Sequence, residues 1–263
     1  MGALIQQNGI FIRTGPRIPR VCFLDELRGL CILLMVVYHG AYDIIYMFGF
    51  NIPIFHSPLV RLAQPFVAGI FVFISGMACR FSRSNLKRGC LTLLAGLGMS
   101  GVTLFILPLF SVSQPIYFGI LHLLGTGMLL FAALERKGDS LTPIPGMLLC
   151  LILFAVTLGV GEGRLGIGPA SISLPAALNG IRWLLPLGFY GAGSDYFPLL
   201  PWIFLFYAGS YMGVPFARQE ALGFFYRSHI PALSAVGRYT IFIYLLHQPV
   251  LYGVLSIVLR IVL

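Results

Sequence analysis

The sequence predicts an all-α polytopic integral membrane protein: a helical bundle of about seven transmembrane helices, plus a re-entrant or interfacial helix. Three observations support this fold class. Of the 263 residues, 58% are hydrophobic and only 10% are charged, whereas an ordinary soluble domain carries about 25% charged residues. The mean hydropathy is +0.93. Several segments also reach the roughly 20 apolar residues that a helix needs to cross a bilayer.

Seven apolar segments are the expected spans, with boundaries defined to within a few residues. In chain order they are Leu27–Phe48, Val60–Cys79, Cys90–Phe110, Phe118–Leu134, Gly146–Val160, Leu199–Val214 and Tyr239–Leu259. Residues 1–23 form a basic N-terminal arm. Residues 24–263 are expected to form a single transmembrane domain, because no stretch outside the spans is long and polar enough for a separate soluble domain.

Basic residues gather in alternate connections, and this pattern predicts the orientation of the chain. They lie in the N-terminal arm and in the second, fourth and sixth connections: Arg13, Arg17, Arg20, Arg80, Arg83, Lys87, Arg88, Arg136, Lys137, Arg218, Arg227 and Arg238. Gly49–Leu59 and Ser111–Tyr117 have none. The positive-inside rule then places the N-terminus in the cytoplasm and the C-terminus outside the cell membrane. The net charge of +9 therefore reflects topology and attraction to anionic lipids, and it does not require nucleic acid.

One connection, Gly161–Pro198, is long and rich in Gly and Pro. Its apolar stretch Leu174–Leu187 is interrupted by Pro175, Arg182 and Pro186. A full span here would reverse the orientation of every later loop, so a re-entrant or interfacial helix on the outer side fits the charge pattern better. Irregular backbone survives in membranes where it lines a polar cavity, which makes the segment a candidate lid on the acceptor side.

The first span carries the strongest candidate site, because ionisable side chains in a membrane span are costly and usually functional. Arg28 and His39 are eleven residues apart, which places them on one helix face and about 16 Å apart along the axis. Asp43 follows His39 by four residues and lies on the same face. Arg28 suits bidentate binding of phosphate, and His39 suits proton transfer near neutral pH. Asp43 would orient the imidazole.

Other polar residues have two interpretations that the sequence leaves open. His122 is either a site residue or an interhelical hydrogen bonder, and His247 either acts in the site or satisfies the kink at Pro249. Asp195 either caps the sixth span or binds a polar acceptor with Arg182 as its charge partner. Trp202 fits an aromatic belt. The five cysteines have no metal-ligand spacing, so no metal site is expected.

The order and spacing of short motifs resemble those of membrane acyltransferases. Arg28 and His39, with ten residues between them, resemble the first-span signature of the acyltransferase-3 group, and 71–76 and 237–249 resemble its later motifs. Further motifs at 38–43, 118–122 and 195–202 make the chain most similar to bacterial relatives of heparan-α-glucosaminide N-acetyltransferase. The resemblance covers nearly the whole chain from Leu24 onward.

This resemblance implies transfer of an acyl group, usually acetyl, from cytosolic acyl-CoA to an amine or hydroxyl of a sugar-type or glycan-type acceptor presented across the membrane. It identifies Arg28 and His39 as the catalytic-motif pair. The lysosomal branch has asparagine where His39 stands, and its active histidine lies in the loop after the first span, where His56 is the nearest analogue. The choice between His39 and His56 stays open, as do the acceptor, the acyl chain and N- or O-transfer.

The expected mechanism gives each candidate a role. Arg28 and Arg80 would hold phosphates of CoA, and His39 would act as general base or acyl carrier, oriented by Asp43. His122 or His247 would polarise the thioester carbonyl. The acceptor would enter from outside, past Asp195, Trp202 and Arg182. The expected partners are lipids, the donor acetyl-CoA and the acceptor, without nucleic acid or metal, and a homo-oligomer stays open. The alternative is a small-molecule transporter or proton-coupled carrier that uses the same buried charges.

Overall fold

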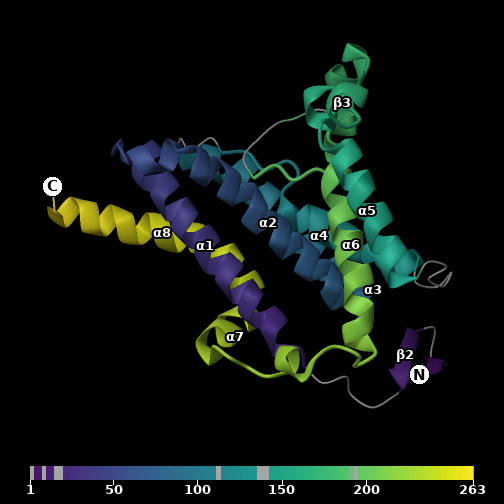
Figure 1. Ribbon diagram of the computed structural model, residues 1–263. Coiled ribbons are helices and arrows are strands. Elements are labelled where there is room, and N and C mark those ends of the chain that lie inside the picture. The colour runs from purple at the N-terminus through teal and green to yellow at the C-terminus, as the bar shows by residue number, and fades with distance from the viewer. Residues whose placement is uncertain are drawn as a thin grey trace. The chain divides into compact units, whose positions relative to one another are not determined.

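The computed structural model describes residues 3–7, 10–14, 20–110, 114–134, 142–189, 191 and 195–262. Most of these residues belong to α-helices (Figure 1). The helices are α1 (Cys22–Tyr46), α2 (Pro58–Cys79), α3 (Asn85–Gly101), α4 (Ile120–Leu134), α5 (Pro143–Thr157), α6 (Leu199–Ala217), α7 (Pro231–Arg238) and α8 (Thr240–Val262). Strands within the described residues form two antiparallel hairpins, β1 (Ala3–Gln7) with β2 (Ile10–Thr14) and β3 (Arg164–Leu165) with β4 (Ile172–Ser173). The predicted all-α class is confirmed.

The apolar helices lie where the sequence places the spans. Within the described residues, six are long and apolar enough to cross a membrane: Cys22–Tyr46, Pro58–Cys79, Asn85–Leu109, Pro143–Glu162, Leu199–Ala217 and Thr240–Val258. The third continues α3 through a π-helical turn, Val102–Ile106, and a 3₁₀ turn, Leu107–Phe110. The remaining predicted span, Phe118–Leu134, the fourth in chain order, corresponds to α4, which is apolar but has only 15 residues. The multi-pass membrane bundle is therefore confirmed. The predicted basic residues Arg17, Arg136 and Lys137 lie outside the described residues.

The chain divides into two compact units. Unit 1 comprises Met1–Ile18 and Val72–Glu220, and unit 2 comprises Pro19–Phe71 and Ala221–Leu263. Helix α2 contributes its first two-thirds to unit 2 and its last turns to unit 1. The expectation of a single transmembrane domain from residue 24 to residue 263 stays a prediction.

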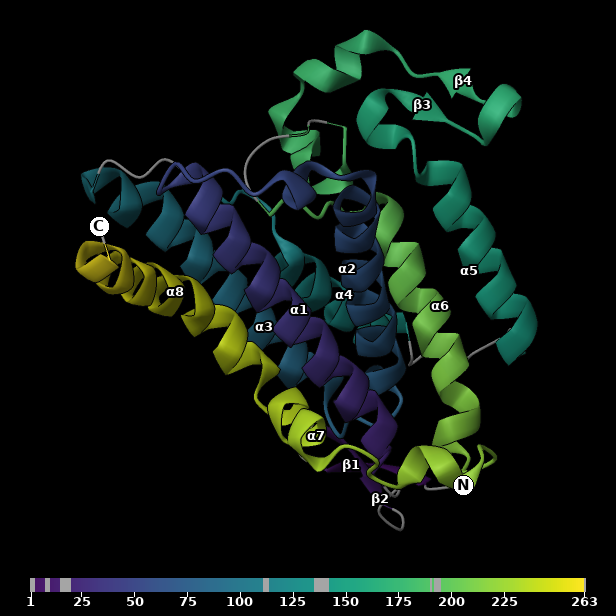
Figure 2. The same cartoon turned by 60° about the vertical axis from the view of Figure 1, so that its left-hand side comes forward.

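Unit 1 is held together by close helix contacts at glycines. Helices α5 and α6 lie side by side, as Figure 2 shows, and α3 packs along α4. A methyl group at Gly209 of α6 would collide with the carbonyl of Phe73 in α2, and one at Gly146 of α5 would collide with the ring of Tyr211. Such small residues let helix backbones approach closely where lipid provides no hydrophobic driving force between helices.

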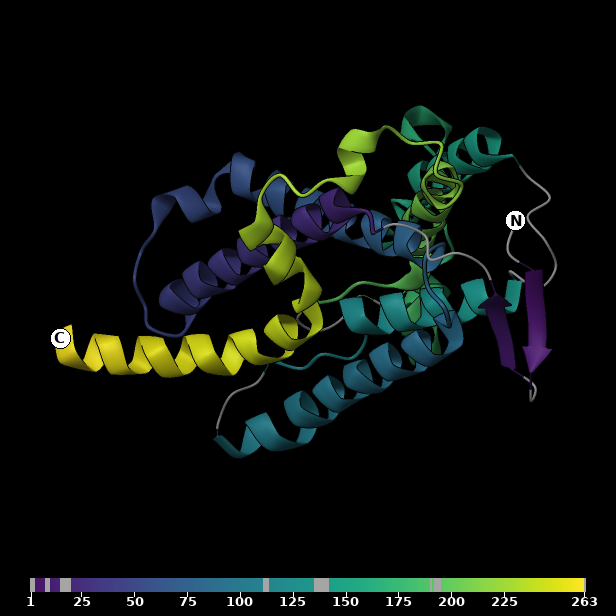
Figure 3. The ribbon, with the colours of Figure 1, turned by 90° about the horizontal axis from the view of Figure 1, so that it is seen from below.

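Unit 2 is built around α1, which packs against α7 and α8 (Figure 3). Gly29 of α1 faces the carbonyl of Leu233, and Gly237 of α7 faces the carbonyl of Asp25, so neither position has space for a side chain. Two short 3₁₀ helices complete the unit, η1 (Pro53–His56) and η9 (Gly223–Tyr226). The sequence did not predict α7, because eight residues with one buried face are too short for a clear helical pattern.

The Gly- and Pro-rich connection in unit 1 is irregular rather than a further span. It contains the 3₁₀ helices η5 (Val160–Glu162), η6 (Gly168–Ala170), η7 (Ala176–Gly180) and η8 (Arg182–Leu187) besides the β3–β4 hairpin. The stretch expected as a re-entrant or interfacial helix is helical only as the two short pieces η7 and η8. Pro175 directly precedes η7 and Pro186 lies inside η8, and proline lacks the N–H that a longer helix would need.

Candidate functional site

Two histidines from opposite ends of the chain meet in unit 2. His39 lies on α1 and His247 on α8, and their ring centroids are 5.0 Å apart with an interplanar angle of 61°. Both side chains are half-buried. The sequence nominated each histidine separately, and the packing of α8 against α1 brings them together. Imidazole is the side chain best suited to proton transfer near neutral pH, so two imidazoles at this distance form a candidate catalytic pair.

The hydrogen bonding of His247 determines its tautomer. Its Nδ1 atom lies 2.5 Å from the backbone carbonyl oxygen of Tyr244. A carbonyl can only accept a hydrogen bond, so Nδ1 carries the proton and donates. In the neutral ring, Nε2 is then the atom with the free lone pair, and in the charged ring it is a second donor. His247 can therefore accept a proton at Nε2 while Tyr244 keeps its orientation.

Asp43 connects α1 to α8 beside the histidine pair. Its side chain is completely buried, and its Oδ1 atom accepts a hydrogen bond of 2.8 Å from Nε2 of Gln248. Within the described residues, Oδ2 of Asp43 and Oε1 of Gln248 are buried without a hydrogen-bond partner. The bond of Asp43 thus goes to the neighbouring helix and not to the ring of His39, and its orienting role stays a prediction. Sequence reasoning missed Gln248, because only the helix packing shows its partner.

The other end of α1 carries a charged cluster. Arg28, 18% exposed at its side chain, lies with Nη1 3.4 Å from Oδ1 of Asp25, and Arg20 lies 2.5 Å from Oδ2 of the same carboxylate. This arrangement keeps the guanidinium of Arg28 at the end of the helix, where it remains partly accessible. Because α1 is one unbroken helix from Cys22 to Tyr46, Arg28 and His39 share a helix face about 16 Å apart.

Glu26 has a structural role that the sequence alone does not show. Its Oε1 atom accepts hydrogen bonds from the Ser228 hydroxyl at 2.9 Å and from the backbone N–H groups of His229 and Ile230 at 2.6 and 2.8 Å. These residues lead directly into α7, so the buried carboxylate of Glu26 ties α1 to the start of that helix. Charge-assisted hydrogen bonds of this kind are about twice as strong as neutral ones.

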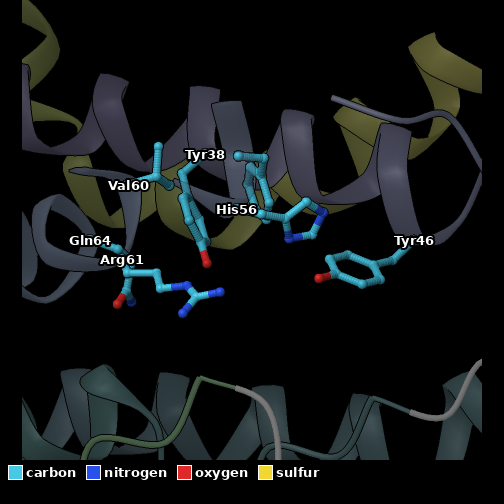
Figure 4. Close-up of a pocket in the computed structure, with 7 residues that line it drawn as sticks. Tyr38, Tyr46, His56, Val60, Arg61 and Gln64 are labelled. Carbon is cyan, nitrogen blue, oxygen red and sulfur yellow. The ribbon is translucent and has the colours of Figure 1, made fainter. Parts of the chain in front are cut away.

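A pocket opens in unit 2 between the last turns of α1, η1 and the first turns of α2 (Figure 4). It has a volume of about 370 Å³. Its walls mix aromatic and polar side chains, namely Tyr38, Tyr46, Phe55, His56, Val60, Arg61 and Gln64. Figure 4 shows the hydroxyls of Tyr38 and Tyr46, the imidazole of His56 and the guanidinium of Arg61 turned toward the same space. The structure therefore places His56, the alternative to His39, on the pocket wall.

His122, in unit 1, has both ring nitrogens in use. Nδ1 accepts a hydrogen bond of 3.2 Å from the backbone N–H of Gly119, so the proton of the neutral ring is on Nε2. Nε2 lies 3.3 Å from the hydroxyl of Ser100, which in turn donates to the carbonyl of Ile116 at 2.6 Å. This chain of bonds joins α3 to α4. The geometry therefore favours the interhelical role that the sequence left open for His122.

Arg80, also in unit 1, is buried at the end of α2. Its Nε atom donates to the carbonyl oxygen of Ser210 at 2.9 Å, and its guanidinium carbon lies 4.9 Å from the ring centroid of Phe131 and 5.8 Å from that of Tyr211. Cation–π contacts and a backbone hydrogen bond stabilise a buried guanidinium. Arg80 is thus part of the packing between α2 and α6, and its proposed contact with CoA stays a prediction.

The three acceptor-side candidates of unit 1 occupy different surroundings. Asp195 has a positive φ of 49°, and its carboxylate lies close to Gly119 at the start of α4. Trp202 is held between the rings of Phe154 at 5.8 Å and Phe197 at 5.3 Å. Arg182 is exposed at the start of η8.

Tyr196, next to Asp195, anchors this region to η8. Its hydroxyl donates to the carbonyl of Leu185 at 2.6 Å, and burial raises the pKa of Tyr196 to about 12. The phenol therefore stays protonated and keeps donating this bond throughout the physiological range.

The structure thus brings together His39, Asp43 and His247, and places Arg28 on the same helix as two of them. His122, Arg80, Asp195, Trp202 and Arg182 belong to unit 1. No group of three His, Cys, Asp or Glu side chains within the described residues has a geometry that could hold a metal ion. The pocket residues Tyr46, Arg61 and Gln64 were missed by sequence reasoning. Sequence reasoning could have found Arg61, because this basic residue comes just after Gly49–Leu59, a connection without Lys or Arg.

Comparison with known proteins gives one match. A family model described as "Heparan-alpha-glucosaminide N-acetyltransferase, catalytic" matches residues 20–249. The match includes all of α1 and the part of α8 that carries His247 and Gln248. No curated protein and no solved structure matches the chain. The wider resemblance to the acyltransferase-3 group stays a prediction.

Proposed function

The chain belongs to the heparan-alpha-glucosaminide N-acetyltransferase family, and we propose that it transfers an acetyl group from acetyl-CoA to a sugar-type or glycan-type acceptor. The observation that carries the proposal is the histidine pair His39–His247, which lies within the matched catalytic region. Acyl transfer needs a general base within reach of the reacting atoms, and this pair can supply one. The match to a catalytic region favours this function over transport, which needs no catalytic region.

The donor is proposed to bind at the N-terminal end of α1. CoA carries several phosphates, and the guanidinium of Arg28 can hold one of them with two parallel hydrogen bonds. The positive-inside pattern supports a cytoplasmic position for this end, with the N-terminus inside and the C-terminus outside a cell membrane. The pantetheine arm then runs along α1 for about 16 Å toward His39. Arg80 is a second phosphate ligand in this proposal, although its guanidinium already has the partners described above.

The transfer requires one base and one group that stabilises negative charge. His39 takes the proton from the acceptor amine or hydroxyl, whose nitrogen or oxygen attacks the thioester carbonyl carbon. The carbon–sulfur bond breaks, a carbon–nitrogen or carbon–oxygen bond forms, and the proton passes to the sulfur to give free CoA. His39 acting as acyl carrier remains the second route, in which its ring nitrogen is acylated first.

His247 is the better placed of the two histidines proposed to polarise the carbonyl. Its Nδ1–H is occupied by Tyr244, so a protonated ring directs Nε2–H at the developing oxyanion. His122 would first have to release Gly119 or Ser100. In this proposal Asp43, on the same helix as His39, supports the charged form of the pair.

The acceptor enters from the side opposite to the donor. Asp195, Trp202 and Arg182 are the acceptor-side residues in this proposal, and the topology that places them outside rests on the same charge pattern as the position of Arg28. The identity of the acceptor atom, amine or hydroxyl, follows from product analysis.

Turnover of labelled acetyl-CoA tests the proposal. Purified protein receives radiolabelled acetyl-CoA and a panel of amino sugars and polyols, as wild type and as Arg28→Ala, His39→Ala and His56→Ala. We expect His39→Ala to lose about 10²–10⁴-fold in kcat while still binding acetyl-CoA, as expected for a general base. Arg28→Ala should raise the KM for acetyl-CoA about tenfold, as for the loss of a charge-assisted hydrogen bond.

The control for charge loss is Arg164→Ala, since Arg164 is exposed and pairs only with Glu162 among the carboxylates of the described residues. Near-normal transfer by His39→Ala together with loss in His56→Ala would move the base to His56. Folded protein that binds neither acetyl-CoA nor longer acyl-CoAs would overturn the proposal in favour of transport.

A further inference from the structure

We propose that the pocket between α1, η1 and α2 binds the acceptor as a single sugar ring that carries a negative charge, and that Arg61 recognises this charge. The inference rests on the proposed function and adds the chemical class of the acceptor. Three observations support it: the aromatic walls of the pocket, the position of Arg61, and the contact between the pocket and the histidine pair.

The aromatic walls suit the face of a sugar ring. Tyr38 stacks on Phe55 with centroids 5.1 Å apart and an interplanar angle of 29°, and Tyr46 lies edge-on to His56 at 6.4 Å. The apolar C–H faces of a pyranose pack against aromatic rings, while the two phenol hydroxyls and the amide of Gln64 can exchange hydrogen bonds with sugar hydroxyls. A volume of about 370 Å³ lies at the small end of the range for ligand sites and accommodates one ring rather than a long chain.

Arg61 is a charged side chain in an unusual place. It is exposed near the start of α2 and directly follows a connection, Gly49–Leu59, without Lys or Arg. By the positive-inside rule, this is the outer side, where basic residues are uncommon. No ion pair joins Arg61 to a carboxylate among the described residues.

The acidic residues of unit 2 have other partners. Asp25 pairs with Arg20 and Arg28, Glu26 binds the residues before α7, and Asp43 is buried against Gln248. Among the described residues of unit 2, no carboxylate therefore occupies the guanidinium of Arg61, and its fork of parallel N–H donors can bind the two oxygens of a ligand. A carboxylate or phosphate group matches that fork in geometry and charge, whereas a cationic ligand would be repelled.

The pocket is next to the proposed base. The ring of Tyr38, which lines the pocket, contacts the ring of His39 edge-on with centroids 5.7 Å apart, and His39 in turn contacts His247 at 5.0 Å. A sugar held against Tyr38 would therefore lie against the aromatic neighbour of the proposed base, with its anionic group facing Arg61. His56 also lines this pocket, so in this proposal it contacts the acceptor without having to serve as the base.

The test compares two sugars that differ only in a phosphate, glucosamine and glucosamine 6-phosphate. Binding of each is measured by calorimetry without acyl-CoA, on protein in phosphatidylcholine nanodiscs. We expect wild-type protein to bind glucosamine 6-phosphate about tenfold more tightly than glucosamine, in line with one charge-assisted contact. Arg61→Gln should remove this preference, so that the two sugars bind with similar affinity. Arg61→Lys should keep part of the preference, because it keeps the charge and loses the fork.

The control variant is Arg164→Gln, which removes an exposed arginine outside the pocket, and unfolding curves confirm that each variant is folded. The anionic group could belong to a lipid-anchored acceptor or to a free sugar. Nanodiscs that contain phosphatidylglycerol, an anionic lipid, distinguish these two sources. If the lipid weakens binding of glucosamine 6-phosphate to wild type but not to Arg61→Gln, the charge recognised is that of a lipid-anchored acceptor. If it has no effect, the acceptor is a free anionic sugar.

Equal binding of the two sugars by wild type would overturn the inference, as would an equal loss of both in Arg61→Gln. These results are distinguishable from failure of the proposed function. A preference for the phosphorylated sugar without any acetyl transfer would reject the transferase and keep the pocket. Transfer to neutral and anionic acceptors with a KM that Arg61→Gln leaves unchanged would reject the inference and keep the transferase.

Discussion

The two units of this protein use the histidines of their helices in different ways. In unit 1, His122 has one nitrogen bonded to the backbone of Gly119 and the other to Ser100, so its ring is a connector between α3 and α4. In unit 2, His247 uses one nitrogen to bind Tyr244, and its other face meets His39. No hydrogen bond engages the ring of His39 among the described residues. A costly polar residue in a membrane span is therefore not enough to indicate chemistry, and the decisive question is whether its nitrogens are already bonded.

The largest difference between the units is expected when His247 in unit 2 and His122 in unit 1 are each replaced by alanine and kcat and stability are compared. His247→Ala should lower kcat by about 10²–10³-fold with little loss of stability, because it removes a donor to the oxyanion. His122→Ala should leave kcat of the folded protein nearly unchanged and lower its stability by about 1–3 kcal/mol, because Ser100 and Gly119 lose a buried partner. Initial rates and unfolding curves on the same preparations measure both quantities. The reverse pattern would place the oxyanion donor in unit 1.

The next effect concerns glycine contacts, which the two units share. Gly237→Ala in unit 2 and Gly209→Ala in unit 1 should each destabilise the protein by about 1–3 kcal/mol, because the added methyl group meets a backbone carbonyl that cannot move alone. Gly223→Ala is the matched control, since no atom lies within 4 Å of its added methyl group. The measurement is the unfolding midpoint in one detergent. A similar midpoint for all three variants would contradict the close packing of α1 on α7 and α2 on α6.

The sequence predicted local features well and long-range features poorly. Apolar length predicted the positions of the six helices that are long enough to cross a membrane and of the shorter α4, since it is a property of consecutive residues. The partners of Glu26, Asp43 and His39 lie about 200 residues away, and no local pattern shows which helices will pack together. The η7–η8 region shows the same limit, because its prolines predicted a break in the helix but not the course of the chain after it.

The candidate site was predictable in part for the same reason. Arg28 and His39 share one helix face, so spacing alone identified them as a pair. The pocket combines side chains of α1, η1 and α2, and its residues have ordinary explanations when each is considered by itself. Tyr46 resembles a belt residue, and Gln64 resembles a polar helix start. Only the fold shows that both face the same space as Arg61 (Figure 4).

The smallest expected effect is the coupling energy of a single interhelical hydrogen bond in each unit. Double-mutant cycles on unfolding free energy would compare Asp43 with Gln248 in unit 2 and Ser100 with His122 in unit 1. Interhelical hydrogen bonds in membranes contribute about 0.6 kcal/mol on average, and we expect this value for the neutral pair Ser100–His122. For Asp43–Gln248 we expect about 1.5 kcal/mol, because the acceptor is a carboxylate that is completely buried. Equal couplings would mean that Asp43 is protonated in the folded protein. A neutral Asp43 could not stabilise a charged histidine beside it, so the contrast between the two units would then rest on the histidine pair alone.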